Sequence, residues 1–588
     1  MNPSQARTTD VAANCFFNGL YRESRLASIV AVGEDRFLTI PIGSNSDIRV
    51  KVLRMSKTGM NCYSSTIVRG DSDGKWWEFI TFERAVECIL SNAELVGDIS
   101  ASQKSAFLDA VMESHRNTWV ALDRYGHHQD DKMWQFLEAE QSLFIGHSMH
   151  PAPKSRSNLS IELSQQLSPE LKASFCLRWF AASDDIMVGD SAGTESWQDY
   201  LLELRQSDSS LPDEIHEYDH HQGWNVFPMH PWQAEQMLAL SSIQPHVKSG
   251  QLVDLGFAGQ SWSATSSTRA LFNPDSPFML KYSLSVKLTN SIRLLSEKEV
   301  KRGVALASIC EHLTPSQYEL ISHELRILQE PAYMGLVDGD GLIIDESLLT
   351  IRENPFRASL ESSHRSQAVL ATLCQQTPYS SDSSVLSSMI RTQSKRKKAS
   401  AESVALEWFE QFCDKVVLPI FTLQSQLGIV LLAHQQNIVV EMEEGLPTQS
   451  YFRDCQGVGL TKLAFSLFPH LGSPTETDNY WNDDKVNRYF PYYLIINSAY
   501  GVIASLSSLV DEDQLFMILR LRLLALYESN PADHDCLKYV LTSPNLCCKG
   551  NFFCYLHGLN ENSIPDPSII YFDLNNPLVA TQELVDEL

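Results

Sequence analysis

The sequence has none of the features that mark a secreted or membrane-spanning protein. Its 12 cysteines are scattered and form no CxxC pair, so reduced thiols in a cytosol fit best. The first ten residues, MNPSQARTTD, contain no apolar run of a secretion signal. The longest uncharged stretch, residues 489–510, is interrupted by Asn497 and several serines, which predicts a buried helix rather than a membrane span. We therefore expect a cytoplasmic protein.

Basic residues are scarce relative to acidic ones. The chain of 588 residues has 46 lysines and arginines against 72 acidic residues, a formal net charge of −26. This excess repels nucleic acid and anionic membranes, so we expect neither as a partner. A site for anions must therefore be a local basic cluster. No P-loop and no Rossmann fingerprint is present, which removes the usual support for P-loop ATPase and dinucleotide-binding functions.

Hydrophobic periodicity predicts a mixture of helices and sheets. The first hundred residues combine short strand-like runs with a helix-like pattern at FFNGLYRE, and a clearer helix follows at 107–119. Residues 224–292 read as antiparallel strands, and helical periodicity returns at 301–312. The Ser-rich, basic stretch 357–403 is predicted to be an exposed connection. A helix over 402–426, a strand hairpin and a mostly helical remainder complete this α+β pattern.

The first candidate site is a strand with lysine on one face. Residues 278 to 288 alternate between apolar and polar except at Met279, which places Lys281 on the polar face. The NPDSP segment before it predicts a turn, so Arg269 would lie opposite Lys281. Ser267 would lie opposite Ser283. Two facing cations destabilise a sheet unless an anion lies between them, and this group suits a di- or triphosphate. A solvent-facing strand with scattered lysines is the alternative.

The residues that follow predict a second anion site. Thr289, Asn290 and Ser291 are expected to cap a helix that carries Arg293 in its first turn. Free N–H groups and a partial positive charge at a helix start favour a carboxylate or phosphate there.

The third candidate lies on the hairpin between AHQQN and RD. Apolar runs on both sides of EEGLP predict two strands that bring Asp454 back beside Asn437. An amide oxygen and a carboxylate near phosphates make a Mg²⁺ site, with His434 at its rim. The alternatives are a structural histidine and an aspartate that only forms a turn.

A fourth cluster lies in the loop-like segment IGHSMHPAPKSRSNLS. His147, His150, Lys154 and Arg156 fall within ten residues and form a dense set of donors for an anion. The HxxH spacing also occurs at zinc sites, but no cysteine or second histidine pair accompanies it. The histidines of PDEIHEYDHH are interpreted as a surface loop.

Together these motifs resemble those of the NRPS-independent siderophore synthetases, the IucA/IucC-like family. GHSMHPAPKSR is similar to the family's GHPxHPxxKxR element, and FPMHPWQ is similar to its HPWQ element. SSTRAL with Lys281 and Arg293 resembles its Ser-x-Arg, Lys and Arg series. AHQQN with RD resembles its HxQN and downstream RD, and SPNLCCKGNFF resembles its Lys-x-Asn segment, which places Lys549.

The resemblance implies a cupped-hand fold around a central ATP cleft. A thumb would cover residues 1–160, fingers with antiparallel strands and the phosphate site 161–400, and a mostly helical palm 401–588. It implies that a citrate carboxylate attacks the α-phosphate of ATP, after which an amine or alcohol displaces AMP. The segment CFFNGLYRE resembles the citrate-activating subgroup, and members are commonly dimers.

The resemblance also implies roles for single residues. ATP would contact His150, Lys154, Arg156, Ser267, Thr268, Arg269, Lys281, Asn437 and Asp454. Mg²⁺ would be held by Asn437 and Asp454. Citrate would be held by Thr289, Arg293, His434 and Lys549. The catalytic set would be Lys281, Arg293 and His434.

Three positions depart from the family pattern, and two other functions stay open. Asn158, Leu432 and Tyr555 stand where the family usually has Gly, Glu and Arg, which bears on substrate contacts more than on ATP chemistry. A kinase-like phosphotransferase is the first alternative, because a histidine-led loop followed by a hairpin and an aspartate also resembles a kinase catalytic and metal loop. A non-enzymatic protein that binds an anion or an iron chelate is the second. The identity of the nucleophile is left open.

Overall fold

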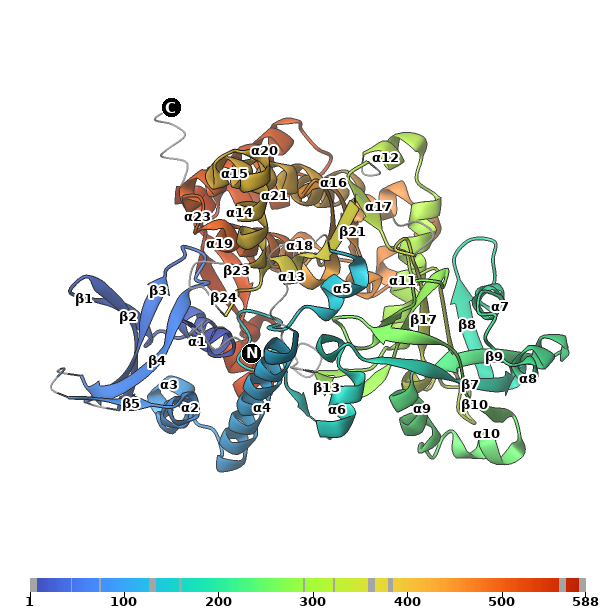
Figure 1. The fold of residues 1–588 in the computed structure, drawn as a ribbon. Helices are drawn as coiled ribbons and strands as arrows, with labels where there is room; N and C mark the ends of the chain where they lie inside the picture. Colours follow the sequence, from blue (N-terminus) through green and yellow to red (C-terminus); the bar gives the residue numbers. More distant parts are fainter. Residues whose placement is uncertain are drawn as a thin grey trace.

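The computed structural model describes residues 8–43, 45–72, 74, 76–125, 134–157, 161–288, 291–320, 323–357, 365–378, 384–559 and 567–580. Figure 1 shows an N-terminal sheet in blue, a larger sheet in green on the opposite side, and helices in yellow to red above and between them. The fold thus mixes helices and sheets, as the sequence predicts.

The N-terminal part is a five-stranded antiparallel sheet packed on helices. The strands run in chain order β1-β2-β3-β4-β5, with bounds Ser28–Val32, Asp35–Gly43, Ser46–Arg54, Cys62–Asp71 and Trp77–Ile80. The helices are α1 (Val11–Glu23), α2 (Phe82–Ser91), α3 (Ala93–Val96) and α4 (Ala101–Tyr125). Phe16 and Phe17 of α1 are buried against this sheet and against Phe552 from the far end of the chain. The strands and helices predicted here are confirmed.

The middle of the chain forms an eight-stranded sheet of order β8-β16-β17-β12-β11-β10-β7-β9. All its pairings are antiparallel. The strands are β7 (Ser174–Ser183), β8 (Met187–Ser191), β9 (Trp224–Met229), β10 (Leu252–Ala264), β11 (Ala270–Phe272), β12 (Phe278–Tyr282), β16 (Ala332–Leu336) and β17 (Leu349–Glu353). Helices α7 (Trp197–Gln206), α9 (Pro231–Leu238) and α10 (Gln244–Ser249) lie along it. The antiparallel strands predicted over 224–292 are therefore confirmed, except that α9 and α10 occupy the stretch between β9 and β10.

The predicted register of the Lys281 hairpin is wrong by one residue. Lys281 pairs with Ala270, and the carbonyl of Arg269 instead accepts the N–H of Tyr282 at 2.9 Å. β11 begins only at Ala270, so Arg269 belongs to the loop before it, and its side chain is not fixed by the pleat. Ser283 is fully buried and donates to the carbonyl of Asp345, away from any phosphate site.

Arg293 lies in a strand and not in the predicted helix. β14 (Ser291–Arg293) pairs with β13 (Leu284–Leu288), which also pairs with β6 (Arg156–Ser157). Helix α11 (Glu297–Glu311) starts later because Ser296 and Glu299 form a capping box there. Thr289 and Asn290 lie outside the described residues.

The stretch 357–403 is only partly an exposed connection. Its described residues include β18 (Arg365–Val369), α13 (Leu370–Cys374) and α14 (Val385–Lys397). Val385, Leu386 and Ile390 of α14 enter the largest hydrophobic core, and they give this polar segment the apolar face that its composition obscured.

The C-terminal part is mostly helical around one hairpin. β20 (Ile438–Glu443) and β21 (Leu446–Phe452) form the predicted antiparallel hairpin. The main helices are α15 (Ala401–Phe412), α16 (Leu418–Leu427), α18 (Asp483–Pro491), α19 (Tyr500–Leu506), α20 (Glu512–Glu528), α21 (Asp535–Thr542) and α22 (Phe552–Leu556). Strands β23 (Asn545–Lys549) and β24 (Tyr571–Asn575) pair near the end. No helix in the described part of the chain is both long and apolar enough to span a bilayer.

Candidate active site

One cavity of about 440 Å³ collects the residues that the sequence singled out. Its walls come from the loop 146–156, the β10–β11 loop, β12, β14, the segment 434–437, Asp454 and the end of β23. All the predicted site residues that the structure describes line it: His150, Lys154, Arg156, Ser267, Thr268, Arg269, Lys281, Arg293, His434, Asn437, Asp454 and Lys549. Thr289, the remaining one, lies outside the described residues.

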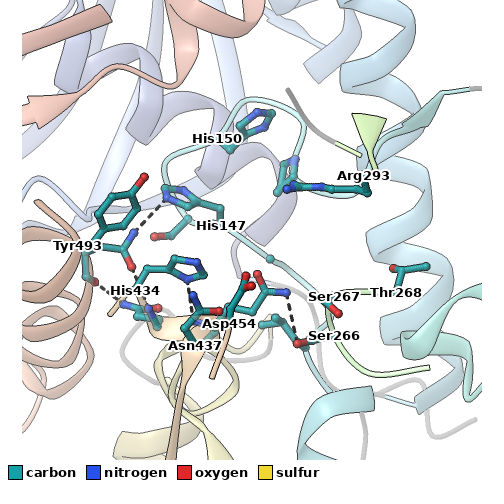
Figure 2. A pocket seen from close by; sticks show the side chains of 18 of the residues that line it. His147, His150, Ser266, Ser267, Thr268, Arg293, His434, Asn437, Asp454 and Tyr493 are labelled. Carbon is teal, nitrogen blue, oxygen red and sulfur yellow. Dashed lines mark hydrogen bonds between the residues drawn. The ribbon is translucent and has the colours of Figure 1, made fainter. Parts of the chain in front are cut away.

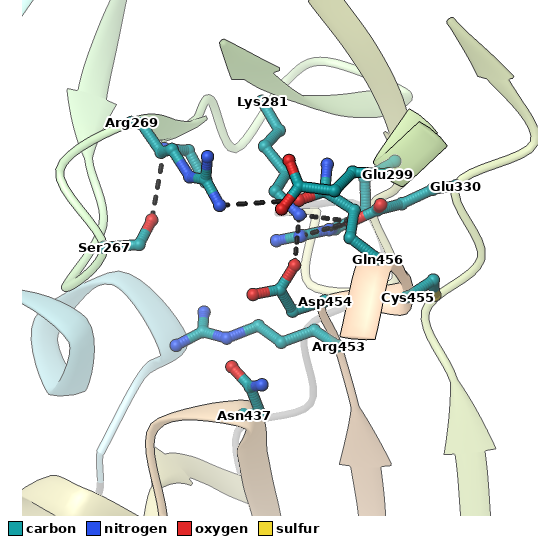
Figure 3. A network of polar contacts seen from close by, with 12 residues as sticks. Ser267, Arg269, Lys281, Glu299, Glu330, Asn437, Arg453, Asp454, Cys455 and Gln456 are labelled. Atoms are coloured by element: carbon teal, nitrogen blue, oxygen red, sulfur yellow. Dashed lines mark hydrogen bonds and ion pairs between the residues drawn. The ribbon is translucent and has the colours of Figure 1, made fainter. Parts of the chain in front are cut away.

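Lys281 lies at the centre of a buried ion network (Figure 3). Its ammonium contacts the carboxylate of Asp454 and lies 3.3 Å from Glu330. Glu330 is fully buried and also accepts from Nε of Arg352 at 3.0 Å. A carboxylate therefore lies beside Lys281, where the sequence predicted an anion. Glu330 holds Lys281 from behind, while the side chain of Asp454 is 33% exposed and faces the cavity.

Nearby cations determine the ionisation of the carboxyl group of Asp454. Burial alone would raise its pKa, but Lys281, Arg269 and Arg352 lower that pKa well below the usual range. Asp454 also has φ of 75°, a left-handed conformation that a non-glycine residue adopts only at a cost. The surrounding structure therefore fixes an ionised carboxylate at the cavity wall.

A second buried ion pair fixes the loop that carries Ser267 and Thr268. Nη1 of Arg453 lies 2.7 Å from Glu140, and Nη2 donates to the hydroxyl of Ser266 at 3.2 Å. Glu140 also accepts the backbone N–H of Ser266 at 2.9 Å. Thr268, at the tip of this loop, has φ of 67°. Two distant segments, those of Glu140 and Arg453, thus hold the loop against the cavity.

The guanidinium group of Arg269 lies against the backbone of Arg293. Nη1 of Arg269 donates to the backbone carbonyls of Arg293 and Leu294 at 3.2 and 3.3 Å. Burial, and then the charge of Arg269, lower the pKa of Arg293 to about 10. An anion that contacts both arginines would relieve the repulsion between their charges. The anion site inferred for Arg293 is thus retained, although a strand and not a helix start builds it.

Two histidines present a defined face to the cavity (Figure 2). Nδ1 of His150 accepts the N–H of Ala152 at 3.0 Å, and Nδ1 of His434 accepts the N–H of Gln436 at 3.2 Å. A neutral ring whose Nδ1 accepts carries its proton on Nε2. Burial, followed by the charges of Arg453, Arg293 and Lys549, lowers the pKa of His434 to about 4, although Asp454 opposes this shift. His434 is therefore a neutral hydrogen-bond donor.

Lys154 and Arg156 are less available to an anion than their sequence pattern suggests. Both contact the buried carboxylate of Glu170, which lies 3.6 Å from the ammonium of Lys154. Their charges lower the pKa of Glu170 to about 2 even though burial would raise it. Lys154 also donates to the carbonyl of Leu143 at 2.5 Å. Glu170 therefore neutralises part of the charge of this loop.

The positions that depart from the family pattern have specific contacts. Asn437 donates through its amide nitrogen to the carbonyl of Leu432 at 3.4 Å, so the backbone of Leu432 orients that amide. The hydroxyl of Tyr555 lies 3.1 Å from that of Ser155, and its ring packs 4.7 Å from His150. Asn158 lies outside the described residues. Nowhere in the described ranges do three or more His, Cys, Asp or Glu side chains form a group that could hold a metal.

Sequence reasoning missed the buried partners of the site. Glu140, Glu330 and Arg352 belong to no motif recognised in the sequence, and only their charge within apolar segments could have indicated them. It also missed that GDSAG, residues 189–193, fits the GxSxG pattern of hydrolases. Ser191 ends strand β8 and donates to the carbonyl of Glu195 at 2.7 Å. It is not among the residues that line the cavity, so the match has no counterpart at the site.

Comparisons with solved structures define the class of fold. The ATP-bound aerobactin synthetase IucA from a hypervirulent pathotype of Klebsiella pneumoniae superimposes with a TM-score of 0.88 at 34% identity, covering 97% of this chain and 100% of that one. The petrobactin biosynthesis protein AsbB from Bacillus anthracis gives 0.74 at 16% identity, which shows a shared fold only. The architecture is therefore that of a siderophore synthetase.

Sequence comparisons identify the family. N(2)-citryl-N(6)-acetyl-N(6)-hydroxylysine synthase of Vibrio mimicus is 41% identical over 587 residues, 98% of this chain and 97% of its own. The Escherichia coli synthase of the same name is 34% identical and covers 99% of both chains. Residues 135–375 match the IucA / IucC family profile, and residues 406–564 match a profile described as ferric iron reductase FhuF-like transporter. The chain belongs to the IucA/IucC family and is an ATP-dependent ligase.

Proposed function

We propose that this chain activates a carboxylate of citrate with ATP and joins it to the α-amine of N6-acetyl-N6-hydroxylysine. The observation that carries the proposal is the charge of the cavity. Asp454 is the one acidic side chain among the described residues that line it, against basic side chains from several segments. The relatives that span nearly the whole chain are named for this citryl product.

The chemistry requires two anions to approach each other. A carboxylate oxygen bonds to the α-phosphorus of ATP, and the bond from that phosphorus to the pyrophosphate oxygen breaks. The amine then bonds to the acyl carbon, AMP leaves with its oxygen, and the amine loses one proton. Lys281 and Arg269 would neutralise the phosphates, while Arg293 and Lys549 would hold citrate, so catalysis would be mainly positional and electrostatic.

His434 would donate a hydrogen bond to a substrate oxygen. It would not accept a proton from the nucleophile. Its Nδ1 accepts from the backbone and its pKa is low, so Nε2 presents an N–H to the cavity. Such a donor would stabilise charge that develops on the carboxyl or phosphoryl oxygen. A general base must accept a proton, which this ring does poorly in that tautomer.

Mg²⁺ is part of the same proposal, with Asn437 and Asp454 as its protein contacts. The partly exposed carboxylate of Asp454 and the oriented amide of Asn437 are oxygen donors of the kind that Mg²⁺ uses together with phosphate oxygens and water. When bound, the ion would offset the charge of the triphosphate.

We also propose a cytoplasmic location, where ATP and citrate are available, and a homodimer. The free cysteines agree with a reducing compartment. The three-part division at residues 160 and 400 remains part of this proposal. Sedimentation of the purified chain would test the dimer.

Pyrophosphate release tests the proposed reaction. With ATP, Mg²⁺ and a panel of carboxylic acids, we expect pyrophosphate to be released only when citrate is present. Hydroxylamine is added to trap the activated acid. AMP should accompany the pyrophosphate, whereas ADP would indicate a kinase. N6-acetyl-N6-hydroxylysine should then replace hydroxylamine more efficiently than lysine does. Turnover independent of citrate would contradict the proposal.

A further inference from the structure

Glu23 links helix α1, near the N-terminus, to a segment near the C-terminus that lies beside the cavity. It is the last residue of α1, in the segment CFFNGLYRE. Its Oε1 accepts the backbone N–H groups of Asn551 and Phe552 at 2.5 and 2.8 Å, and its Oε2 accepts that of Phe553 at 3.1 Å. One carboxylate thus binds three consecutive N–H groups more than 500 residues away.

The segment that Glu23 binds carries two residues of the cavity wall. Lys549 ends strand β23, and both Lys549 and Asn551 line the cavity. Gly550, between them, donates to the carbonyl of Ile570 at 2.8 Å. A Cβ on Gly550 would lie 3.1 Å from Oε2 of Glu23, so the carboxylate packs where a side chain would otherwise be.

These bonds are of the strong kind, because the acceptor can carry a full charge. Burial raises the pKa of Glu23, and the N–H groups of Phe552, Asn551 and Phe553 oppose this effect. The same N–H groups open the short helix α22, where no earlier helical turn can accept them. Loss of the carboxylate would leave three N–H groups without this acceptor.

We propose that Glu23 is a positioning residue that holds Lys549 and Asn551 in the geometry that binds citrate. The inference rests on the proposed function, in which Lys549 contacts a citrate carboxylate. Because the phosphate-side residues Ser267, Arg269 and Lys281 lie on other segments, loss of the Glu23 contact should affect citrate and not ATP.

Glu512 offers a matched control. It is buried, whereas Glu23 is half-buried, and it too joins the N-terminal part to the C-terminal helices, since it accepts the N–H of Lys57 at 2.7 Å. It is not among the residues lining the cavity. Glu512→Gln therefore replaces the carboxylate of a similar contact between distant segments by a neutral amide, without touching the Lys549 segment.

The test compares Glu23→Gln with Glu512→Gln in the full-length protein. For Glu23→Gln we expect the KM for citrate to rise about tenfold or more while the KM for ATP stays within about twofold. Hydrogen exchange of a peptide spanning 549–556 should be faster in that variant alone. For Glu512→Gln we expect both KM values to be those of the wild type.

The outcomes separate two failures. If wild-type turnover does not depend on citrate, the proposed function is wrong. If it does, but Glu23→Gln leaves the citrate KM and the exchange of 549–556 unchanged, the positioning role is wrong. An equal rise in both KM values would also overturn it, since that indicates a general loss of structure. Glu23→Asp, which keeps the charge on a shorter side chain, should retain more citrate affinity than Glu23→Gln.

Discussion

At the scale of single residues, Lys281 has two carboxylate partners with different surroundings. Glu330 is shared with Arg352 in the interior, whereas Asp454 faces the cavity. A phosphate entering the cavity can therefore take the place of Asp454 beside Lys281 without leaving Glu330 unpaired. This exchange would allow the buried Lys281 to bind a phosphate although it is already ion-paired.

Replacement of Lys281 tests this exchange. We expect Lys281→Met to raise the KM for ATP at least about tenfold, because one phosphate contact is lost and Asp454 then faces the phosphates without its ion-pair partner. Breaking a buried pair should also lower stability by about 3–5 kcal/mol. Lys301→Met is the control, since Lys301 forms an exposed pair with Glu297 at 2.6 Å, and such pairs contribute under about 1 kcal/mol. An unchanged KM for ATP in Lys281→Met would contradict the phosphate site.

The protonation of His434 gives a second prediction at this scale. With a pKa lowered to about 4, the ring should stay neutral with its proton on Nε2 at every pH above about 5, whereas an unperturbed histidine titrates near 6.5. Nitrogen-15 NMR of histidine-labelled protein checks this, with His434→Gln identifying the signal. A titration midpoint near 6.5, or a proton on Nδ1, would show that His434 can act as a base.

At the scale of elements, local pattern predicted the elements better than their pairing. The alternation over 278–288 gave the strand that carries Lys281, although the structure divides this stretch into β12 and β13, which belong to different sheets. The apolar runs around EEGLP gave the hairpin that returns Asp454 to Asn437. The pairing of Lys281 was wrong because Arg269 lies outside β11, which no alternation can reveal. Arg293 was misplaced because the capping box at Ser296 starts the helix later. The charge of Glu140 and Glu330 within apolar segments could at most indicate burial, and their partners could not be predicted because these lie far away in the chain.

The strained loop between β10 and β11 can be tested against an ordinary turn. Thr268 at φ 67° and Glu444 at φ 50° both have left-handed backbones, a conformation that glycine adopts without strain. Each change to glycine should alter stability by no more than about 1 kcal/mol. Thr268→Gly should also raise the KM for ATP several-fold because it loosens the phosphate loop, whereas Glu444→Gly, in the exposed β20–β21 turn, should not. Equal KM values for ATP in the two variants would show that the β10–β11 loop does not belong to the ATP site.

At the scale of the whole molecule, this strongly acidic protein contains a basic cavity. The formal charge is −26, yet basic side chains from the N-terminal loop, the middle sheet and the C-terminal hairpin converge on the cavity. Their charges are balanced behind the wall by Glu140, Glu170 and Glu330. The acidic surface disfavours polyanions, while this cavity favours small ones, so specificity for small acids and nucleotides follows from the distribution of charge and not from its total.

The buried histidines make global stability depend on pH. Burial lowers the pKa of His147 and His230 to about 3 and that of His434 to about 4. Below about pH 6.5 these histidines take up protons in the unfolded chain but not in the folded chain. Each ring therefore leaves the free energy of unfolding at its full value above pH 6.5 and lowers it as the pH falls toward 4. Each ring should lower the free energy of unfolding by about 2 kcal/mol between pH 7 and pH 5. Carboxyls with a raised pKa, such as Glu23 and Glu512, act in the opposite direction.

We expect the histidines to dominate, because three large shifts of one sign act in this pH range. Melting temperatures at pH 7, 6 and 5 and constant ionic strength should therefore decrease steadily. In His147→Gln, whose side-chain oxygen can still accept the N–H of Met149 that Nδ1 accepts at 3.1 Å, the decrease should be smaller. A melting temperature that is constant or rises on acidification would mean that the carboxyls with a raised pKa outweigh the buried histidines, which contradicts the prediction.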